Sequence, residues 1–236
     1  MGHIGTRLTV LARTGTGGSG LVRTMAEIPP AGRHAGTAAD GGELWFVIEG
    51  SGRLDLGGAP GPALVPDRGL WIPPGTAYRL EPSGGNGLRV DLVALPAAVS
   101  SAPGQDAPAA NGGDVPLGRD LRDCAVEMTG DREFRVLFGP GHDCAVATQF
   151  VGEIPPGRAP EHSHPYDEVV LILRGAGVAH VGGADCDLSA GTCLHLPPGR
   201  PHCLENTGRE PLRVLGVFHP AGSPASKLPN AQAAPD

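Results

Sequence analysis

The fold is decided by the stretch Gly191-Thr-Cys-Leu-His-Leu-Pro-Pro-Gly-Arg-Pro-His-Cys-Leu-Glu-Asn206. Proline fixes φ and glycine permits a tight corner, so Pro197, Pro198 and Gly199 predict a turn between two short extended runs. Such a turn directs His202 towards a neighbouring strand. Histidine is a metal ligand in many proteins. Three more residues of types that bind metals lie upstream of His202: His162, His164 and Glu168.

Spacing suggests that these four side chains meet. His162, His164 and Glu168 all occupy even positions, so an extended segment would place them on one face, with His202 on a second strand opposite. Two unrelated loop histidines are the plainer interpretation of His162 and His164, but the complete set favours metal binding. Three neutral imidazoles and one carboxylate around a divalent ion leave a net charge of about +1 and open positions for a substrate.

The chain contains two copies of one unit. Four sequence features return 124 to 126 positions later, which indicates a duplicated structural unit of about 90 residues. The repeated features are Glu27-Ile-Pro-Pro30 and Glu153-Ile-Pro-Pro156, Glu43 to Gly50 and Glu168 to Gly175, Ile72-Pro-Pro-Gly75 and Leu196-Pro-Pro-Gly199, and Arg89 to Pro96 and Arg213 to Pro220.

Composition predicts an all-β chain. Its 236 residues include 38 glycines and 25 prolines, and short runs rich in β-branched residues lie between them. No segment has a long amphipathic helical period. We expect a first barrel at residues 1–98, a linker rich in Ala, Pro and Gly at 99–118, a second barrel at 119–222 and a loosely attached tail at 223–236.

With both motifs in place, the chain resembles the cupin superfamily and, more closely, a bicupin with two tandem double-stranded β-helix (jelly-roll) barrels. The first cupin motif runs from Gly157 to Gly175, with four residues instead of five between the opening glycine and His162. The second motif is the stretch from Gly191 to Asn206. The resemblance implies that the metal ligands are His162, His164, Glu168 and His202.

The first copy has lost this ligand pattern. Thr37, Ala39 and Tyr78 stand where the three histidines stand in the second copy, and only Glu43 is kept. One carboxylate without imidazole partners does not hold a transition metal well, so we predict that the first barrel is metal-free and structural. An organic ligand in that barrel, close to Trp45, Trp71 and Tyr78, is the alternative.

Other residues of the second copy are weaker candidates. His180 and His195 are candidate catalytic bases, and Gln149, Tyr166 and Phe218 are candidates for the substrate pocket, although strand parity alone does not fix which way they face. Gly15 to Gly20 matches a dinucleotide-binding glycine pattern, but that mechanism needs a helix after the last glycine. The residues that follow indicate a strand, so a hairpin loop is expected there.

Charge and hydropathy limit the classes of molecule that we expect this protein to bind. With 18 Lys and Arg against 25 Asp and Glu, the net charge is −7, which argues against nucleic acid. The sequence has no signal-peptide pattern and no apolar segment long enough to span a bilayer, so we expect a cytoplasmic protein without a membrane partner. A small-molecule substrate and a monomer or homodimer are expected. Arginine outnumbers lysine heavily, which suggests a bacterial genome of high GC content.

The motifs lead to a functional hypothesis. Fe(II) or Mn(II) suits the ligand set best, with nickel, cobalt or zinc as alternatives. The resemblance implies an oxidoreductase, foremost a quercetinase-like dioxygenase that uses O2 in small-molecule or secondary metabolism. A non-redox lyase, isomerase or polyketide-type cyclase is the alternative, and a metal-dependent binding protein is a second one. Because imidazole binds metal only when neutral, we expect metal affinity to fall as the pH drops through about 6.5.

Overall fold

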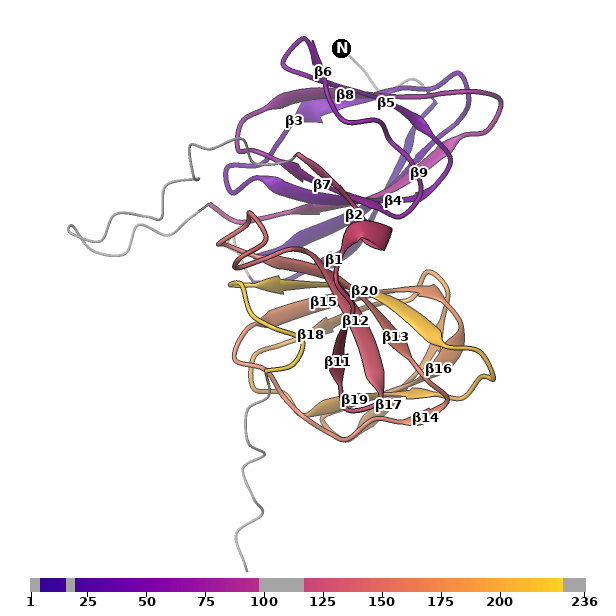
Figure 1. Ribbon diagram of the computed structural model, residues 1–236, viewed down its shortest axis with the longest axis vertical. Helices are drawn as coiled ribbons and strands as arrows, with labels where there is room; N and C mark the ends of the chain where they lie inside the picture. The colour runs from indigo at the N-terminus through magenta and orange to yellow at the C-terminus, as the bar shows by residue number, and fades with distance from the viewer. Residues whose placement is uncertain (1–4, 16–19, 98–116, 227–236) are drawn as a thin grey trace, which may run out of the picture.

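The computed structural model describes residues 5–15, 20–97 and 117–226. In these ranges the chain is all-β apart from one turn of 3-10 helix, η1 (Leu121–Asp123), as the sequence predicts. None of its described helical structure has the length and apolar character needed to cross a membrane. Figure 1 shows two barrels stacked along the long axis, each made of a six-stranded and a four-stranded antiparallel sheet.

Each barrel is described by its strand order. The six-stranded sheet of the first barrel runs β1 (Arg7–Arg13), β2 (Val22–Ile28), β9 (Leu88–Ala94), β4 (Glu43–Glu49), β7 (Arg68–Ile72), β10 (Gly118–Asp120), and its four-stranded sheet runs β3 (His34–Thr37), β8 (Ala77–Pro82), β5 (Gly52–Leu56), β6 (Ala59–Pro60). The second barrel has β11 (Glu127–Thr129), β12 (Arg132–Phe138), β13 (Thr148–Ile154), β20 (Leu212–His219), β15 (Asp167–Arg174), β18 (Cys193–Leu196) in one sheet and β14 (Gly157–Arg158), β19 (His202–Asn206), β16 (Ala176–Val181), β17 (Ala184–Ser189) in the other.

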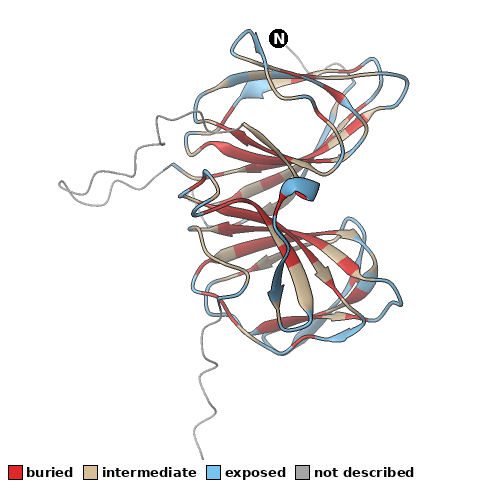
Figure 2. Ribbon diagram, viewed as in Figure 1, coloured by how far each residue is buried: buried red, intermediate tan, exposed pale blue. Residues whose placement is uncertain are grey.

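Except at their edges, the six-stranded sheets are buried on both faces, and β1 at one edge is largely exposed. In β4, Leu44 and Phe46 pack into the contact between the barrels, whereas Trp45 and Val47 point into the first barrel. The strands of these sheets are therefore nearly continuous apolar runs, because both alternating sets of side chains need apolar surroundings. Figure 2 shows the result as a band of buried residues where the two sheets face each other.

One strand crosses from the second repeat to the first barrel. β10 pairs with β7, and the guanidinium of Arg68 binds both carboxylate oxygens of Asp120 at 2.7 and 2.9 Å. We placed the start of the second barrel at residue 119, but Arg119 and Asp120 complete the sheet of the first. The bidentate ion pair and the hydrogen bond from Trp71 N to Leu117 O, at 3.0 Å, hold the strand there.

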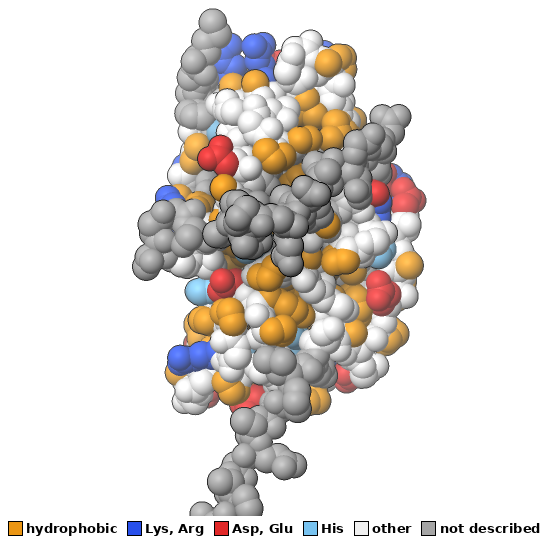
Figure 3. All heavy atoms as spheres, turned by 90° about the vertical axis from the view of Figure 1, so that its left-hand side faces the viewer, with side chains coloured by type: hydrophobic (Ala, Val, Ile, Leu, Met, Phe, Trp, Pro, Cys, Tyr) orange, Lys and Arg blue, Asp and Glu red, His pale blue; other side chains and the backbone are white. Residues whose placement is uncertain are grey.

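The other predicted domain boundaries fall in segments that the structure describes only in part. Most of the expected linker (98–116), the end of the tail (227–236) and the middle of the glycine-rich stretch (16–19) lie outside the described residues. The segment after that stretch forms strand β2 and not the helix that dinucleotide binding needs. The surface shown in Figure 3 mixes hydrophobic, acidic and basic side chains over both barrels.

Candidate metal centre

The four expected ligands converge from two strands and from the segment that precedes one of them. His162 and His164 lie in the segment between β14 and β15, Glu168 lies in β15, and His202 begins β19. Our expectation of one continuous strand from His162 to Glu168 was wrong, because this segment turns before β15. Its position is fixed instead by two backbone hydrogen bonds between His162 and His202, at 3.0 and 2.8 Å.

The side chains form a compact group. One ring nitrogen from each of His162, His164 and His202 lies within 4.8 Å of the other two. His164 and His202 are buried and His162 is partly buried. An oxygen of Glu168 lies 3.8 Å from Nε2 of His164 and 3.7 Å from Nε2 of His202. One ion with bonds of about 2.0–2.2 Å fits between atoms at such separations. The donor set of three imidazoles and one carboxylate fits a divalent transition metal.

Hydrogen bonds orient each imidazole for this role. Nδ1 of His162 lies 3.0 Å from the carbonyl of Pro160, and Nδ1 of His202 lies 2.8 Å from that of Arg200. A carbonyl only accepts, so both Nδ1 atoms carry the proton and leave the Nε2 lone pair for a metal.

The third imidazole is oriented through a tyrosine. The hydroxyl of Tyr166 donates to the carbonyl of Ser223 at 2.7 Å and lies 3.3 Å from Nδ1 of His164. Since its proton is engaged with Ser223, the tyrosine oxygen accepts from His164. His164 therefore adopts the same tautomer as His162 and His202, and its Nε2 faces Glu168.

Burial sets the protonation states in the absence of metal. It lowers the pKa of His162 to about 3 and also lowers the pKa of His202, so both imidazoles are neutral at pH 7. Burial raises the pKa of Glu168 to about 8. A bound cation reverses that last effect, because it stabilises the carboxylate. We expected protonation of histidine to set the pH dependence of metal affinity. Protonation of Glu168 sets it instead, because His162 and His202 stay neutral near pH 7.

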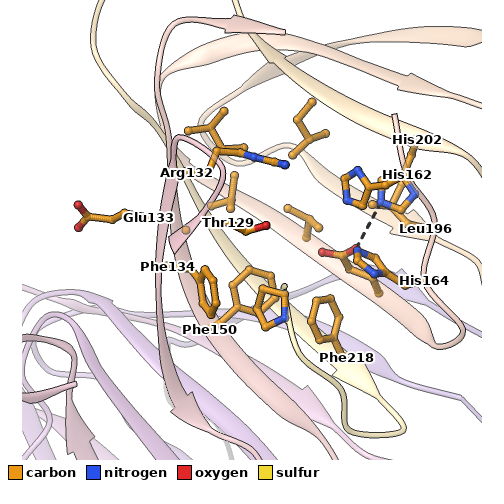
Figure 4. Close-up of a pocket in the computed structure, with 17 residues that line it drawn as sticks. Thr129, Arg132, Glu133, Phe134, Phe150, His162, His164, Leu196, His202 and Phe218 are labelled. Carbon is orange, nitrogen blue, oxygen red and sulfur yellow. Dashed lines mark ion pairs between the residues drawn. The ribbon is translucent and has the colours of Figure 1, made fainter. Parts of the chain in front are cut away.

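A cavity of about 70 Å³ lies against this group. One water-sized probe takes about 10–15 Å³, so this space holds on the order of five water molecules or a small organic molecule. Figure 4 shows His162, His164 and His202 on one side and Phe134 and Phe150 across from them. The lining is mainly apolar and includes Phe134, Phe150, Ile154, Val170, Leu204, Val214 and Phe218.

The pocket candidates from the sequence divide into two groups. Phe218 lines the cavity, and Tyr166 lies behind His164, with stacked rings 5.1 Å apart. Gln149 faces the other barrel, where its Nε2 donates to the carbonyl of Trp45 at 3.3 Å. The prediction that Gln149 contacts substrate is therefore wrong, because the alternate face of β13 is the one that lines the cavity.

Both candidate catalytic bases lie outside the cavity. His180 is held between Asp185 and Glu205, at 2.6 and 3.0 Å, on the outer face of its sheet. The opposite face carries Ala179, which packs in the interior of the barrel. His195 pairs with Asp167 at 2.7 Å, while its neighbour Leu196 points inwards. The structure thus removes both residues from the candidate reaction centre.

In the first barrel a different set of contacts occupies the corresponding place. Both oxygens of Glu43 accept hydrogen bonds, from Nε1 of Trp45 at 2.6 Å and from the backbone N of Ala39 at 3.1 Å. Tyr78 packs edge-on against Trp45, with ring centroids 4.7 Å apart. Thr37 is exposed at the end of β3, and Trp71 points into the contact between the barrels. Glu43 thus has neutral hydrogen-bond donors as partners.

Residues at the start of the second barrel were missed by sequence reasoning. Thr129, Arg132 and Phe134 line the cavity from β11 and β12. They belong to neither repeated motif. Their even spacing in Arg132, Phe134 and Val136 is the only sequence signal that could have identified a common inward face.

Comparisons with known proteins agree with this architecture. Residues 150–218 match the family model described as Cupin domain. A glyoxylate-induced protein of Pseudomonas aeruginosa has a similar structure, with a TM-score of 0.71 and 18% identity over 99% of this chain and 84% of that chain. Oxalate decarboxylase of Bacillus subtilis also has a TM-score of 0.71, with 15% identity over 92% of this chain and 72% of that chain.

A curated relative matches a shorter region. An uncharacterised protein of Methanocaldococcus jannaschii is 32% identical over 60 residues, which are 25% of this chain and 48% of that protein. The chain thus matches about half the length of this relative. The structural similarities, all at low identity, establish the shared fold.

Proposed function

Because this chain has the bicupin fold and carries a cupin domain in its second barrel, we propose that it is a metal-dependent oxidoreductase acting on a small organic substrate. The four-ligand group at one side of an apolar cavity carries this proposal. The first barrel supports the second through their shared core and holds no equivalent ligand set among its described residues.

The cavity favours chemistry at the metal over chemistry by a side-chain base. Among the described lining residues, the ionisable side chains are the four ligands, Arg132 and Glu133, and Glu133 points away from the cavity. His180 and His195, the candidate bases, pair with Asp185 and Asp167 outside this cavity, which argues against a role in proton abstraction. An isomerase or cyclase that needs a positioned base is therefore less favoured than an oxidoreductase.

The residues of the chain have defined tasks in such a reaction. His162, His164, Glu168 and His202 would hold the ion, and the three Nδ1 hydrogen bonds keep their rings in place. Fe(II) or Mn(II), when bound, would supply Lewis-acid polarisation and electron transfer. Phe134, Phe150 and Phe218 keep water away from the reacting atoms.

The volume of the cavity narrows the substrate. A space of about 70 Å³ beside the ligand group accommodates a small acid or diol. We therefore narrow the quercetinase-like expectation to small substrates. Decarboxylation of a small acid is the second candidate, favoured by this volume and by the fold shared with oxalate decarboxylase, for which Mn(II) centres are described.

Metal analysis and product analysis test the proposal together. Atomic emission should find one divalent ion per chain in protein reconstituted with Fe(II) or Mn(II), none after His162→Ala, and an unchanged content after the matched change Glu43→Gln in the first barrel. A panel of two- to four-carbon oxo and hydroxy acids is then incubated with and without O2. Oxygen uptake supports the oxidoreductase, CO2 release under nitrogen supports the decarboxylase, and no metal in the wild-type chain refutes both.

A further inference from the structure

Arg132 lines the cavity, and no ion pair is found for its guanidinium among the described residues. It begins β12, directly after a two-residue turn that contains Gly130 at φ 65°, and it pairs across the hairpin with Thr129. Its Nε is buried without a hydrogen-bond partner. The neighbouring Glu133 points the other way and lies 3.8 Å from Arg135.

The side chain faces the metal centre across the cavity. Figure 4 shows Arg132 extending from β12 towards His162 and His202. A buried guanidinium donor without an acceptor is costly, and a bidentate carboxylate supplies the acceptors that it lacks.

We propose that Arg132 binds the carboxylate of a small organic acid and thereby selects anionic substrates for the metal centre. This inference rests on the proposed function and names the substrate class for it. A divalent ion, the Glu168 carboxylate and the Arg132 guanidinium together carry a charge of about +2, which a dianionic acid bound to both the ion and Arg132 cancels and a monoanionic acid halves. An uncharged diol leaves that charge unbalanced.

The first barrel does not repeat this arrangement. β1 occupies the position in its sheet that β12 occupies in the second, and Arg7 at the start of β1 pairs with Glu27 on the outside. In the described residues of the first sheet, no strand lies beyond β1 as β11 lies beyond β12. The arginine and the hairpin that carries it therefore accompany the metal ligands in the second barrel alone.

The test compares two arginines of the same strand. Oxalate and pyruvate, with their uncharged amides oxamide and pyruvamide as controls, are titrated calorimetrically into Mn(II)-loaded wild-type protein and into Arg132→Gln, Arg132→Lys and Arg135→Gln. We expect Arg132→Gln to weaken binding of both acids on the order of 10- to 100-fold and Arg132→Lys to weaken it less. Arg135→Gln, on the opposite face, should leave it unchanged, and the amides should bind equally to all four proteins.

The outcomes separate the inference from the proposed function. Metal content and thermal unfolding are measured for each variant, and the acids are also titrated into metal-free protein. Equal acid affinity in wild type and Arg132→Gln, with both folded, overturns the role of Arg132 while leaving the metal enzyme intact. A chain that binds no metal but loses acid binding on Arg132→Gln refutes the proposed function and supports the carboxylate site.

Discussion

The guanidinium of Arg23 binds both carboxylate oxygens of Asp91, at 2.8 and 2.9 Å, and both side chains are fully buried between the barrels. Arg23 also donates to the backbone carbonyls of Val169 and Leu215 in the second barrel, at 2.9 and 3.1 Å. One residue of the first repeat therefore satisfies backbone acceptors of two strands in the second. This contact makes the barrels depend on each other for stability.

Removing Arg23 should be strongly destabilising. Arg23→Met leaves Asp91 buried without its partner, so we expect the free energy of unfolding to fall by about 3–5 kcal/mol. Arg7→Met, which breaks the largely exposed pair with Glu27, should cost less than about 1 kcal/mol. Urea unfolding of both variants makes the comparison, and the double variant Arg23→Met/Asp91→Leu should recover much of the loss. A small effect of Arg23→Met would contradict the structural role of the pair.

Metal binding should release a proton from Glu168. With a pKa of about 8 in the metal-free protein, this carboxyl is mostly protonated at pH 7, while the ion binds the carboxylate. Metal affinity should therefore rise about tenfold per pH unit between pH 6 and 7.5 and level off above about 8. Calorimetry in buffers of different ionisation enthalpy counts the protons. Glu168→Gln should remove the release, and an unchanged proton count in that variant would assign it elsewhere.

Glu168 and His162 make the stability of the metal-free protein depend on pH in opposite directions. Between pH 4.5 and 8 the folded state binds a proton at Glu168 that the unfolded state lacks, so this group lowers stability as pH rises. Between pH 3 and 6.5 the unfolded state binds a proton at His162 that the folded state lacks, so acid lowers stability. Saturation with metal should abolish the loss on the alkaline side. Melting curves with and without Mn(II) from pH 5 to 8.5 measure the difference.

Tyr166 should tune the metal site without touching the metal. Tyr166→Phe removes the acceptor of the His164 Nδ1 proton, and loss of such an orienting partner lowers metal affinity about 10- to 100-fold. Tyr78→Phe in the first barrel is the matched control and should leave affinity unchanged. Competition with a chelating dye provides the measurement. Equal affinities of the two variants would show that the orientation of His164 is fixed by other contacts.

The cavity should be sensitive to a single methyl group added next to Phe150, one of its lining residues. A Cβ at Gly216 would lie 2.2 Å from two ring atoms of Phe150, so Gly216→Ala must push that ring towards the cavity. We expect a loss of about 1–3 kcal/mol in stability and weaker binding of small acids. Gly85→Ala has open space around it and serves as the control. Unchanged acid binding in a folded Gly216→Ala variant would place the substrate elsewhere.

The ligand set was predictable because it is a local pattern compared between two copies of one unit. His162, His164, Glu168 and His202 stand out against Thr37, Ala39, Glu43 and Tyr78 without any knowledge of the fold. We expected an extended segment from His162 to Glu168 with His202 on a strand opposite it. The segment turns before β15, and the antiparallel bridge between His162 and His202 brings the group together.

Side-chain direction was less predictable for a physical reason. In a sheet with one solvent-exposed face, polar residues mark the outside, but the central strands of these six-stranded sheets, β13 among them, are buried on both faces. The sequence pattern around Gln149 therefore does not indicate that its side chain faces the first barrel. Arg132 was missed because it lies in a short hairpin outside the motifs, and its charge resembles that of a surface residue.

The crossing of β10 limits how the two repeats can be separated. Residues 118–120 complete the sheet of the first barrel but are encoded with the second repeat. A chain truncated before residue 117 would lack β10 and leave the backbone donors and acceptors along the edge of β7 unpaired. Such an exposed edge pairs with other chains and promotes aggregation. The two repeats are therefore no longer interchangeable units. A fragment that contains the first barrel must extend beyond β10 at its C-terminal end.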